Sequence, residues 1–207
     1  MNNKDAATTI SRRAVLTGTA ALVPLVSISS CTSTQTSPQS VAATSPFTAE
    51  EQAVLRAVVD RLIPADEFSP AASDCGVLTY LDRCLSEWNQ SDVPVLRQTL
   101  QVLEAQAQLR GGAFMALDAS MQDSLLQAME AGEFADAAGQ AGFNRLWRLT
   151  LEGMFSDPYY GGNRDYAGWE LLGYPGAMLA TTPEMQTMGQ RLPNLRTSAY
   201  GAEHDGH

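Results

Sequence analysis

The feature that most constrains the fold of this chain is a run near its C-terminus, residues 157–176, that is rich in both glycine and aromatic side chains. Five of its residues are Tyr or Trp, and five are Gly. Glycine permits positive φ and close approach between backbones, while Tyr and Trp offer broad, stiff surfaces with a polar tip. We therefore expect irregular backbone packed against another surface here, rather than a catalytic loop.

The residues before this run show the apolar spacing of amphipathic helices. Thr48 and Glu51 form a capping box that starts the first helix, and Pro64 ends it. Ser73 or Asp74 is expected to start the second helix. The predicted helices cover about residues 49–63, 76–88, 94–109, 119–131 and 143–155. No alternating strand pattern or internal repeat occurs, so the predicted fold is all-α: a small irregular helical domain with a long glycine- and aromatic-rich loop near its C-terminus.

The chain divides into four predicted segments. An export signal covers residues 1–30 and a flexible linker covers 31–46. The helical domain covers 47–180, and a polar tail covers 181–207.

The N-terminal segment resembles a twin-arginine export signal. Arg12 and Arg13 precede a modest apolar stretch, residues 14–28, which Pro24 interrupts. A membrane-spanning helix needs about 20 predominantly apolar residues. The stretch is therefore predicted to direct export and not to anchor the protein.

Two outcomes remain open at the end of the signal. Ile28-Ser29-Ser30-Cys31 fits the pattern at which a lipoprotein peptidase cuts before a cysteine that then carries lipid. Lipid on Cys31 would tether the protein to the membrane. Ordinary cleavage near Ala42 would instead release a soluble protein.

The other two cysteines, Cys75 and Cys84, could pair in an oxidising compartment. Nine residues of helix would separate them by about 13 Å, which is beyond the roughly 7 Å Cα separation that a disulfide tolerates. Either the chain folds back near Cys75, or both thiols stay free.

The inventory of reactive groups argues against catalysis by this chain. Its histidines, His204 and His207, both lie in the polar tail, so the helical domain holds no imidazole for a catalytic triad or a zinc site. No glycine-rich dinucleotide-binding motif is present. The formal net charge of −10 disfavours nucleic acid as a partner. We predict no catalytic, cofactor-binding or metal-binding residues.

Carboxylates leave two weaker alternatives. Asp157, Asp165 and Glu170 share the glycine-rich run, and a glycosidase uses a pair of carboxylates. Asp157, Asn163 and Asp165 could also bind calcium, although their spacing is irregular. Turn and capping roles explain the same residues, with Asp165 starting a short helix over about 166–172.

The order Asp157-Pro158-x-Tyr160-Gly161-Gly162-Asn163, five residues, Trp169, two residues, then Leu172-Gly173-Tyr174-Pro175-Gly176 carries a family resemblance. It resembles the pattern of the gluconate 2-dehydrogenase subunit 3 family, and a weaker likeness extends back to residue 46. The resemblance implies a periplasmic, membrane-associated accessory subunit. FAD would be bound by a large dehydrogenase subunit and haem c by a multihaem cytochrome subunit, and the twin-arginine translocase would export the large subunit together with this chain.

Contacts with the large subunit are expected in the same run, because Tyr, Trp and Arg dominate the energetic centres of interfaces. The expected anchors are Tyr159, Tyr160, Asn163, Arg164 and Trp169. Alternatively, Trp169 and the tyrosines complete the core of the domain itself. A different class of function also stays open: a free-standing exported lipoprotein that binds a small ligand or a component of the cell envelope.

Overall fold

The structure, a computed structural model, describes residues 45–134, 137–178, 180–189, 192 and 194–201. The export residues Arg12 and Arg13, the candidate lipidation site Cys31, and His204 and His207 lie outside these residues. Every regular element in the described part is helical. The all-α prediction is therefore confirmed.

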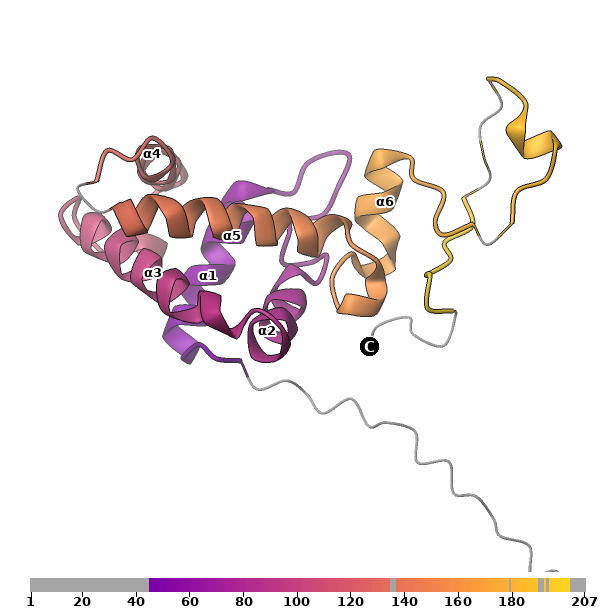
Figure 1. The fold of residues 1–207 in the computed structure, drawn as a ribbon. Coiled ribbons are helices and arrows are strands. Elements are labelled where there is room, and N and C mark those ends of the chain that lie inside the picture. Colours follow the sequence, from indigo (N-terminus) through magenta and orange to yellow (C-terminus); the bar gives the residue numbers. More distant parts are fainter. Residues whose placement is uncertain (1–44, 135–136, 179, 190–191, 193, 202–207) are drawn as a thin grey trace, which may run out of the picture. The chain divides into compact units, whose positions relative to one another are not determined.

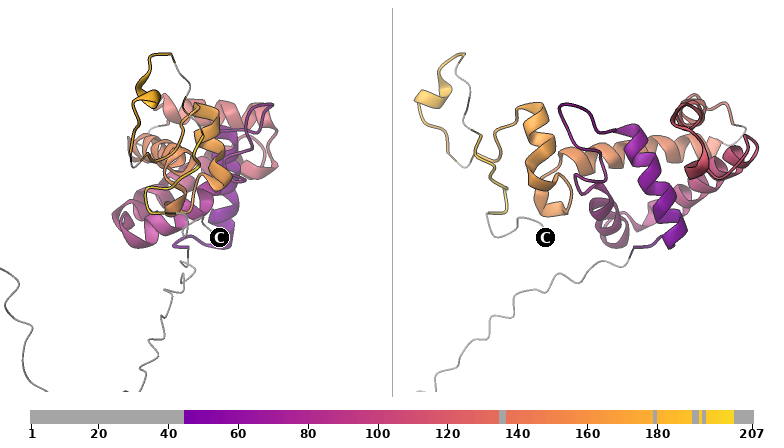
Figure 2. Two further views of the ribbon diagram at one scale, coloured as in Figure 1. Left: turned by 90° about the vertical axis from the view of Figure 1, so that its right-hand side faces the viewer. Right: turned by 180° about the vertical axis from the view of Figure 1, so that it is seen from behind.

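The longest helix, α5, contacts each of the other α-helices (Figures 1 and 2). Their bounds are α1 (Ala49–Leu62), α2 (Val77–Glu87), α3 (Val93–Gln108), α4 (Ala119–Glu130), α5 (Ala137–Phe155) and α6 (Ala167–Leu172). Short 3-10 turns join or follow them: η1 (Gln90–Asp92), η2 (Phe114–Ala116), η3 (Pro158–Tyr160), η4 (Arg164–Tyr166) and η5 (Glu184–Gln186). α5 is thus the element against which the rest of the fold packs.

One continuous apolar core lies among α1 to α5. Each helix contributes a fully buried leucine: Leu55, Leu81, Leu103, Leu125 and Leu149. Phe114 of η2 closes this core with no exposed surface. The stripes that the apolar spacing predicted are the buried faces.

The capping box of α1 is present as predicted. Thr48 Oγ1 accepts the backbone N–H of Glu51, and Glu51 Oε2 accepts the N–H of Thr48. Glu51 Oε1 also accepts a hydrogen bond from Arg97 Nε of α3 at 2.8 Å, so the cap helps to hold α1 and α3 together.

α2 begins within one residue of the predicted position, but the prediction that Ser73 or Asp74 caps it is wrong. Gly76 precedes the helix in the left-handed region, with φ of +82°, and no side chain caps the first turn. Ser73 instead donates its backbone N–H and its hydroxyl to the carboxylate of Asp60 in α1. The capping residue is used for a tertiary contact, and a glycine makes the turn.

The first turns of α5 also differ from the prediction, since the helix begins at Ala137 rather than near Phe143. Two glycines, Gly139 and Gly142, lie in these first turns. At Gly142, an added Cβ would lie 1.8 Å from Thr99 Oγ1 of α3. The missing side chain allows α5 to cross α3 closely, and this packing outweighs the low helix propensity of glycine.

The long loop predicted for residues 157–176, which we call the glycine–aromatic segment, is not confirmed. The segment forms η3, η4 and α6 in succession. Asp165 does not cap α6, because it lies within η4 at φ of +55° and Tyr166 occupies the N-cap position.

Candidate partner interface

The glycine–aromatic segment is attached to the C-terminal end of α5 by hydrogen bonds to carbonyl groups that the helix leaves unpaired. The backbone N–H of Asn163 donates to Gly153 O, and its side-chain Nδ2 donates to Ser156 O, each at 2.8 Å. Trp169 Nε1 donates to Phe155 O at 2.9 Å. The last carbonyls of a helix need such partners, and here one asparagine and one tryptophan supply them.

Two glycines allow this attachment. A Cβ on Gly162 would lie 2.0 Å from Gly153 O, and a Cβ on Gly168 would lie 2.0 Å from Met154 O. Backbone therefore packs directly on backbone, which only glycine permits. The order of glycines, Asn163 and Trp169 in the sequence is the pattern needed to close the end of α5.

The segment is also held to α2 and to the turn that precedes it. Arg164 donates its backbone N–H to Cys75 O, and Arg83 Nη1 donates to Tyr159 O, both at 2.8 Å. The guanidinium of Arg83 also lies 6.0 Å from the centroid of the Tyr159 ring, a cation–π contact. Contacts with two helices fix the position of the tyrosines.

The predicted anchors separate into two groups. Asn163 has no exposed surface and Trp169 is 6 % exposed, so both side chains serve the interior of the domain. Tyr159 and Tyr160 are half-buried, and Arg164 is exposed. Asn163 and Trp169 therefore position the segment, in agreement with the alternative that Trp169 completes the core, while the contact of the five anchors with a partner stays a prediction.

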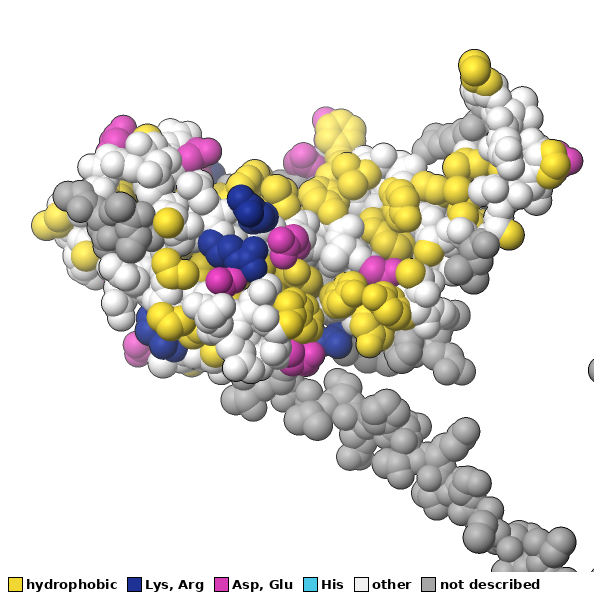
Figure 3. All heavy atoms as spheres, viewed as in Figure 1, with side chains coloured by type: hydrophobic (Ala, Val, Ile, Leu, Met, Phe, Trp, Pro, Cys, Tyr) yellow, Lys and Arg dark blue, Asp and Glu magenta, His cyan; other side chains and the backbone are white. Residues whose placement is uncertain are grey.

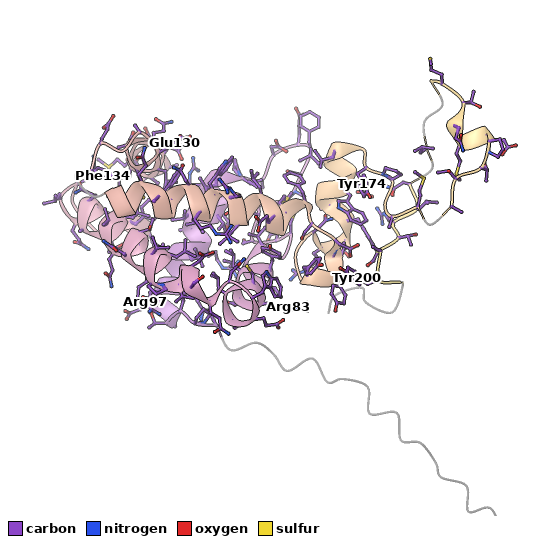
Figure 4. The ribbon with its side chains drawn as sticks, in the orientation of Figure 1. Arg83, Arg97, Glu130, Phe134, Tyr174 and Tyr200 are labelled. Atoms are coloured by element: carbon purple, nitrogen blue, oxygen red, sulfur yellow. The ribbon has the colours of Figure 1, made fainter. Side chains whose placement is uncertain are left out.

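An aromatic surface does form beside the segment, from residues that lie far apart in the sequence. Tyr159 stacks on Tyr200 with ring centroids 4.0 Å apart, and the Tyr160 and Tyr200 hydroxyls lie 2.6 Å apart. Tyr160 contacts Trp88, the residue that follows α2, with ring centroids 5.9 Å apart. Trp88 and Tyr200 are 45 % and 48 % exposed. Figure 3 shows hydrophobic side chains gathered around this end of α5, and Figure 4 labels Tyr200 and Arg83 near it.

Trp88 and Tyr200 are not among the anchors predicted from the sequence. Trp88 lies at the end of an amphipathic helix between polar residues, which is a signal for an exposed aromatic side chain. Tyr200 lies in the segment that we predicted to be a polar tail. Asp157 holds that segment by accepting the Ser198 hydroxyl at 2.7 Å and the Ala199 N–H at 2.8 Å.

A groove of about 740 Å³ opens beside this surface. We call it the aromatic groove; its lining residues are Tyr80, Trp88, Leu151, Glu152, Phe155, Ser156 and Tyr160. Tyr80 donates its hydroxyl to Glu152 Oε2 at 2.9 Å. Burial and then this hydrogen bond raise the pKa of Tyr80 above the ordinary value, so the phenol stays protonated and remains a donor.

Two of the three carboxylates considered as catalysts, Asp157 and Glu170, have structural partners. Asp157 accepts the Tyr159 N–H in addition to Ser198 and Ala199, and Glu170 forms an ion pair with Arg196. Among the described residues, no group of three or more His, Cys, Asp or Glu is placed to hold a metal ion. The contacts of Asp157 are those of a turn and not of a glycosidase acid.

Cys75 and Cys84 are buried free thiols. Of the two alternatives in the sequence analysis, the structure has the unpaired one, because Cys84 lies inside α2 and Cys75 precedes it. Burial raises the pKa of both thiols.

A family model described as gluconate 2-dehydrogenase subunit 3 matches residues 49–176. This range ends where the glycine–aromatic segment ends and covers more than half of the chain. The chain belongs to the gluconate 2-dehydrogenase subunit 3 family. Membership indicates an accessory subunit of a dehydrogenase complex. Searches of curated proteins and of solved structures gave no match.

The helices of this subunit 3 protein that the structure describes include none that is long and apolar enough to cross a membrane.

Proposed function

We propose that this chain is a non-catalytic accessory subunit of a membrane-associated FAD-dependent dehydrogenase of the gluconate or glucose type. It supplies the twin-arginine export signal for the flavin subunit and stabilises that subunit. FAD is bound by the large subunit, haem c is bound by a multihaem cytochrome subunit, and sugar oxidation takes place outside this chain.

The observation that carries the proposal is the aromatic surface beside the family-specific segment, which consists of the exposed Trp88 and Tyr200 and the half-buried Tyr160. Aromatic side chains that are held by defined contacts lose little conformational entropy on binding, which is why they serve as anchors in interfaces. The family-specific residues build the support for this surface, so the family pattern and the proposed contact surface belong to one structural unit.

The proposed location is the periplasm, at the membrane. Arg12 and Arg13 would engage the twin-arginine translocase, which exports proteins that are already folded. A flavin subunit folded around FAD could then cross the membrane while bound to this chain. Lipid on Cys31 would tether the complex afterwards.

The experiment is a pull-down of the tagged full-length chain from the envelope of its host, with mass spectrometry and a flavin absorbance spectrum. A stoichiometric FAD-containing chain that lacks its own export signal supports the proposal. Recovery of this chain alone and without flavin overturns it, and favours the free-standing exported lipoprotein instead.

Export is tested separately by replacing both Arg12 and Arg13 with lysine. The expected result is retention of the flavin subunit in the cytoplasm, while Arg56→Lys on the exposed side of α1 leaves export unchanged. In a Cys31→Ser variant, the complex is expected in the soluble periplasmic fraction. A flavin subunit that still reaches the periplasm in the double lysine variant would contradict the escort role.

A further inference from the structure

The aromatic groove combines ring walls with a carboxylate. Trp88 stands between two tyrosines and contacts each edge to face, with ring centroids 6.4 Å from Tyr80 and 5.9 Å from Tyr160. Glu152 lies in the same groove, and its side chain is 40 % exposed. Aromatic faces attract cations, and a carboxylate beside them adds direct charge attraction.

The charge of Glu152 is only partly compensated by the chain itself. The hydroxyl of Tyr80 occupies Oε2, whereas Oε1 lies 3.7 Å from Arg145 Nη1, which is beyond hydrogen-bonding distance. The close ion pair of Arg145 is with Asp92 instead, and the distance from Arg145 Nε to Asp92 Oδ2 is 2.6 Å. Glu152, Arg145 and Asp92 together therefore carry one net negative charge. Oε1 of Glu152 can still accept a hydrogen bond.

A second polar side chain belongs to the wall of this groove. Ser156 Oγ is buried and has no hydrogen-bond partner among the residues that the structure describes, and Ser156 lines the aromatic groove. A buried hydroxyl without a partner is costly, so the described residues leave one polar atom in this wall unsatisfied.

We propose that the aromatic groove binds an arginine side chain of the partner subunit. A guanidinium is planar, so it can lie against the ring of Trp88 while its N–H groups reach Glu152. The chain already uses the same chemistry between Arg83 and Tyr159. Trp88 and Tyr160 belong both to the groove and to the exposed aromatic surface, so the groove is continuous with the contact surface of the proposed function, on which this inference rests.

The binding test uses the purified full-length chain and N-acetyl-arginine methylamide as the probe, followed through the NMR signal of the Trp88 indole N–H. A Trp88→Phe variant identifies that signal. The expected result is saturable binding in the millimolar range, with the uncharged citrulline analogue and the lysine analogue each at least about fivefold weaker. Equal binding of arginine and citrulline overturns the charge argument, and lysine binding as tight as arginine overturns the assignment to a guanidinium.

Glu152→Gln keeps an oxygen that can accept the Tyr80 hydroxyl and removes only the charge. It is expected to weaken binding of the arginine probe about fivefold. The control Glu130→Gln on α4, at the other end of α5 in Figure 4, is expected to leave binding unchanged. Unchanged binding to the Glu152→Gln variant overturns the proposal. If that variant does not fold, the comparison of arginine with citrulline on the unaltered chain still decides.

The same variants in the host separate this inference from the proposed function. A flavin subunit recovered with the unaltered chain, but several-fold less with Glu152→Gln, supports both. Equal recovery with Glu152→Gln, together with no probe binding, overturns the groove assignment and leaves the accessory-subunit role intact. Probe binding without any flavin subunit in the pull-down overturns the accessory-subunit role and the partner assignment alike.

Discussion

Asn163→Ala should strongly destabilise the domain. Asn163 has no exposed surface, and its amide joins two parts of the backbone: Nδ2 donates to Ser156 O and Oδ1 accepts the Gly168 N–H, each at 2.8 Å. Alanine would leave this carbonyl and this N–H without their partners, at a cost of about 1–3 kcal/mol each. Asn163 also lies at φ of +48°, where alanine is less favourable by about 1 kcal/mol.

Together these effects predict a loss of about 3–7 kcal/mol in the free energy of unfolding, which is a large part of the 5–15 kcal/mol that is usual for a domain. The assay is equilibrium unfolding in urea, followed by circular dichroism. Asn163→Gly removes the same hydrogen bonds without the cost at positive φ, so it should be about 1 kcal/mol less destabilising than alanine. Asn163→Asp should not rescue, because an oxygen would replace the donor that faces Ser156 O.

The matched control is Asn144→Ala, on the exposed side of α5, where a change within about 0.5 kcal/mol is expected. A loss below about 1 kcal/mol for Asn163→Ala would refute the role assigned to its amide. Equal losses for the alanine and glycine variants would refute the contribution from the left-handed backbone.

Three other predictions concern the same region and the core. Gly168→Ala should cost roughly 2–3 kcal/mol in the same unfolding assay, because the new Cβ would lie 2.0 Å from Met154 O; Gly112→Ala, whose Cβ would meet its nearest neighbour at 3.7 Å, should be close to neutral. The pKa of Tyr80 is raised in the folded chain, so the phenol favours folding fully below about pH 10 and progressively less as the pH rises further. The free energy of unfolding of Tyr80→Phe should therefore fall less steeply between about pH 10 and 12 than that of the unaltered chain, by at most about 1.4 kcal/mol per pH unit. Identical slopes for the two proteins would contradict this. Cys75 and Cys84 should react slowly with a thiol reagent in the folded chain and quickly in denaturant without a reductant, and a chain that stays unreactive when unfolded would reveal a disulfide.

Much of the fold could be predicted from the sequence, because local rules and tertiary packing agree in most helices. The capping box at Thr48 and the apolar stripes placed α1 and α4 within a residue or two. The misses occur where a residue serves a distant partner. Ser73 binds Asp60 in place of capping α2, and Gly142 remains in a helix because α3 lies against it.

The candidate site shows the same division. Sequence identified the glycine–aromatic segment and its family, but it could not tell which aromatic side chains face inwards. That depends on the unpaired carbonyls of α5, which Asn163 and Trp169 satisfy. Trp88 and Tyr200 join Tyr160 only through the tertiary fold, since each comes from a different part of the chain.

The internal position of Trp169 changes how its substitution must be interpreted. Trp169→Ala is expected to lower recovery of the complex, but it would also remove the hydrogen bond to Phe155 O and the contacts with Tyr166 and Tyr174. Its effect on binding would then follow from its effect on folding. Trp88→Ala removes a side chain that is 45 % exposed, so it should lower recovery of the flavin subunit while the urea midpoint changes much less than in Trp169→Ala. If recovery falls in both variants only in proportion to lost stability, the aromatic surface is not the contact surface. If Trp88→Ala lowers recovery in a chain of nearly unchanged stability, the surface itself makes the contact and Trp169 supports it from within.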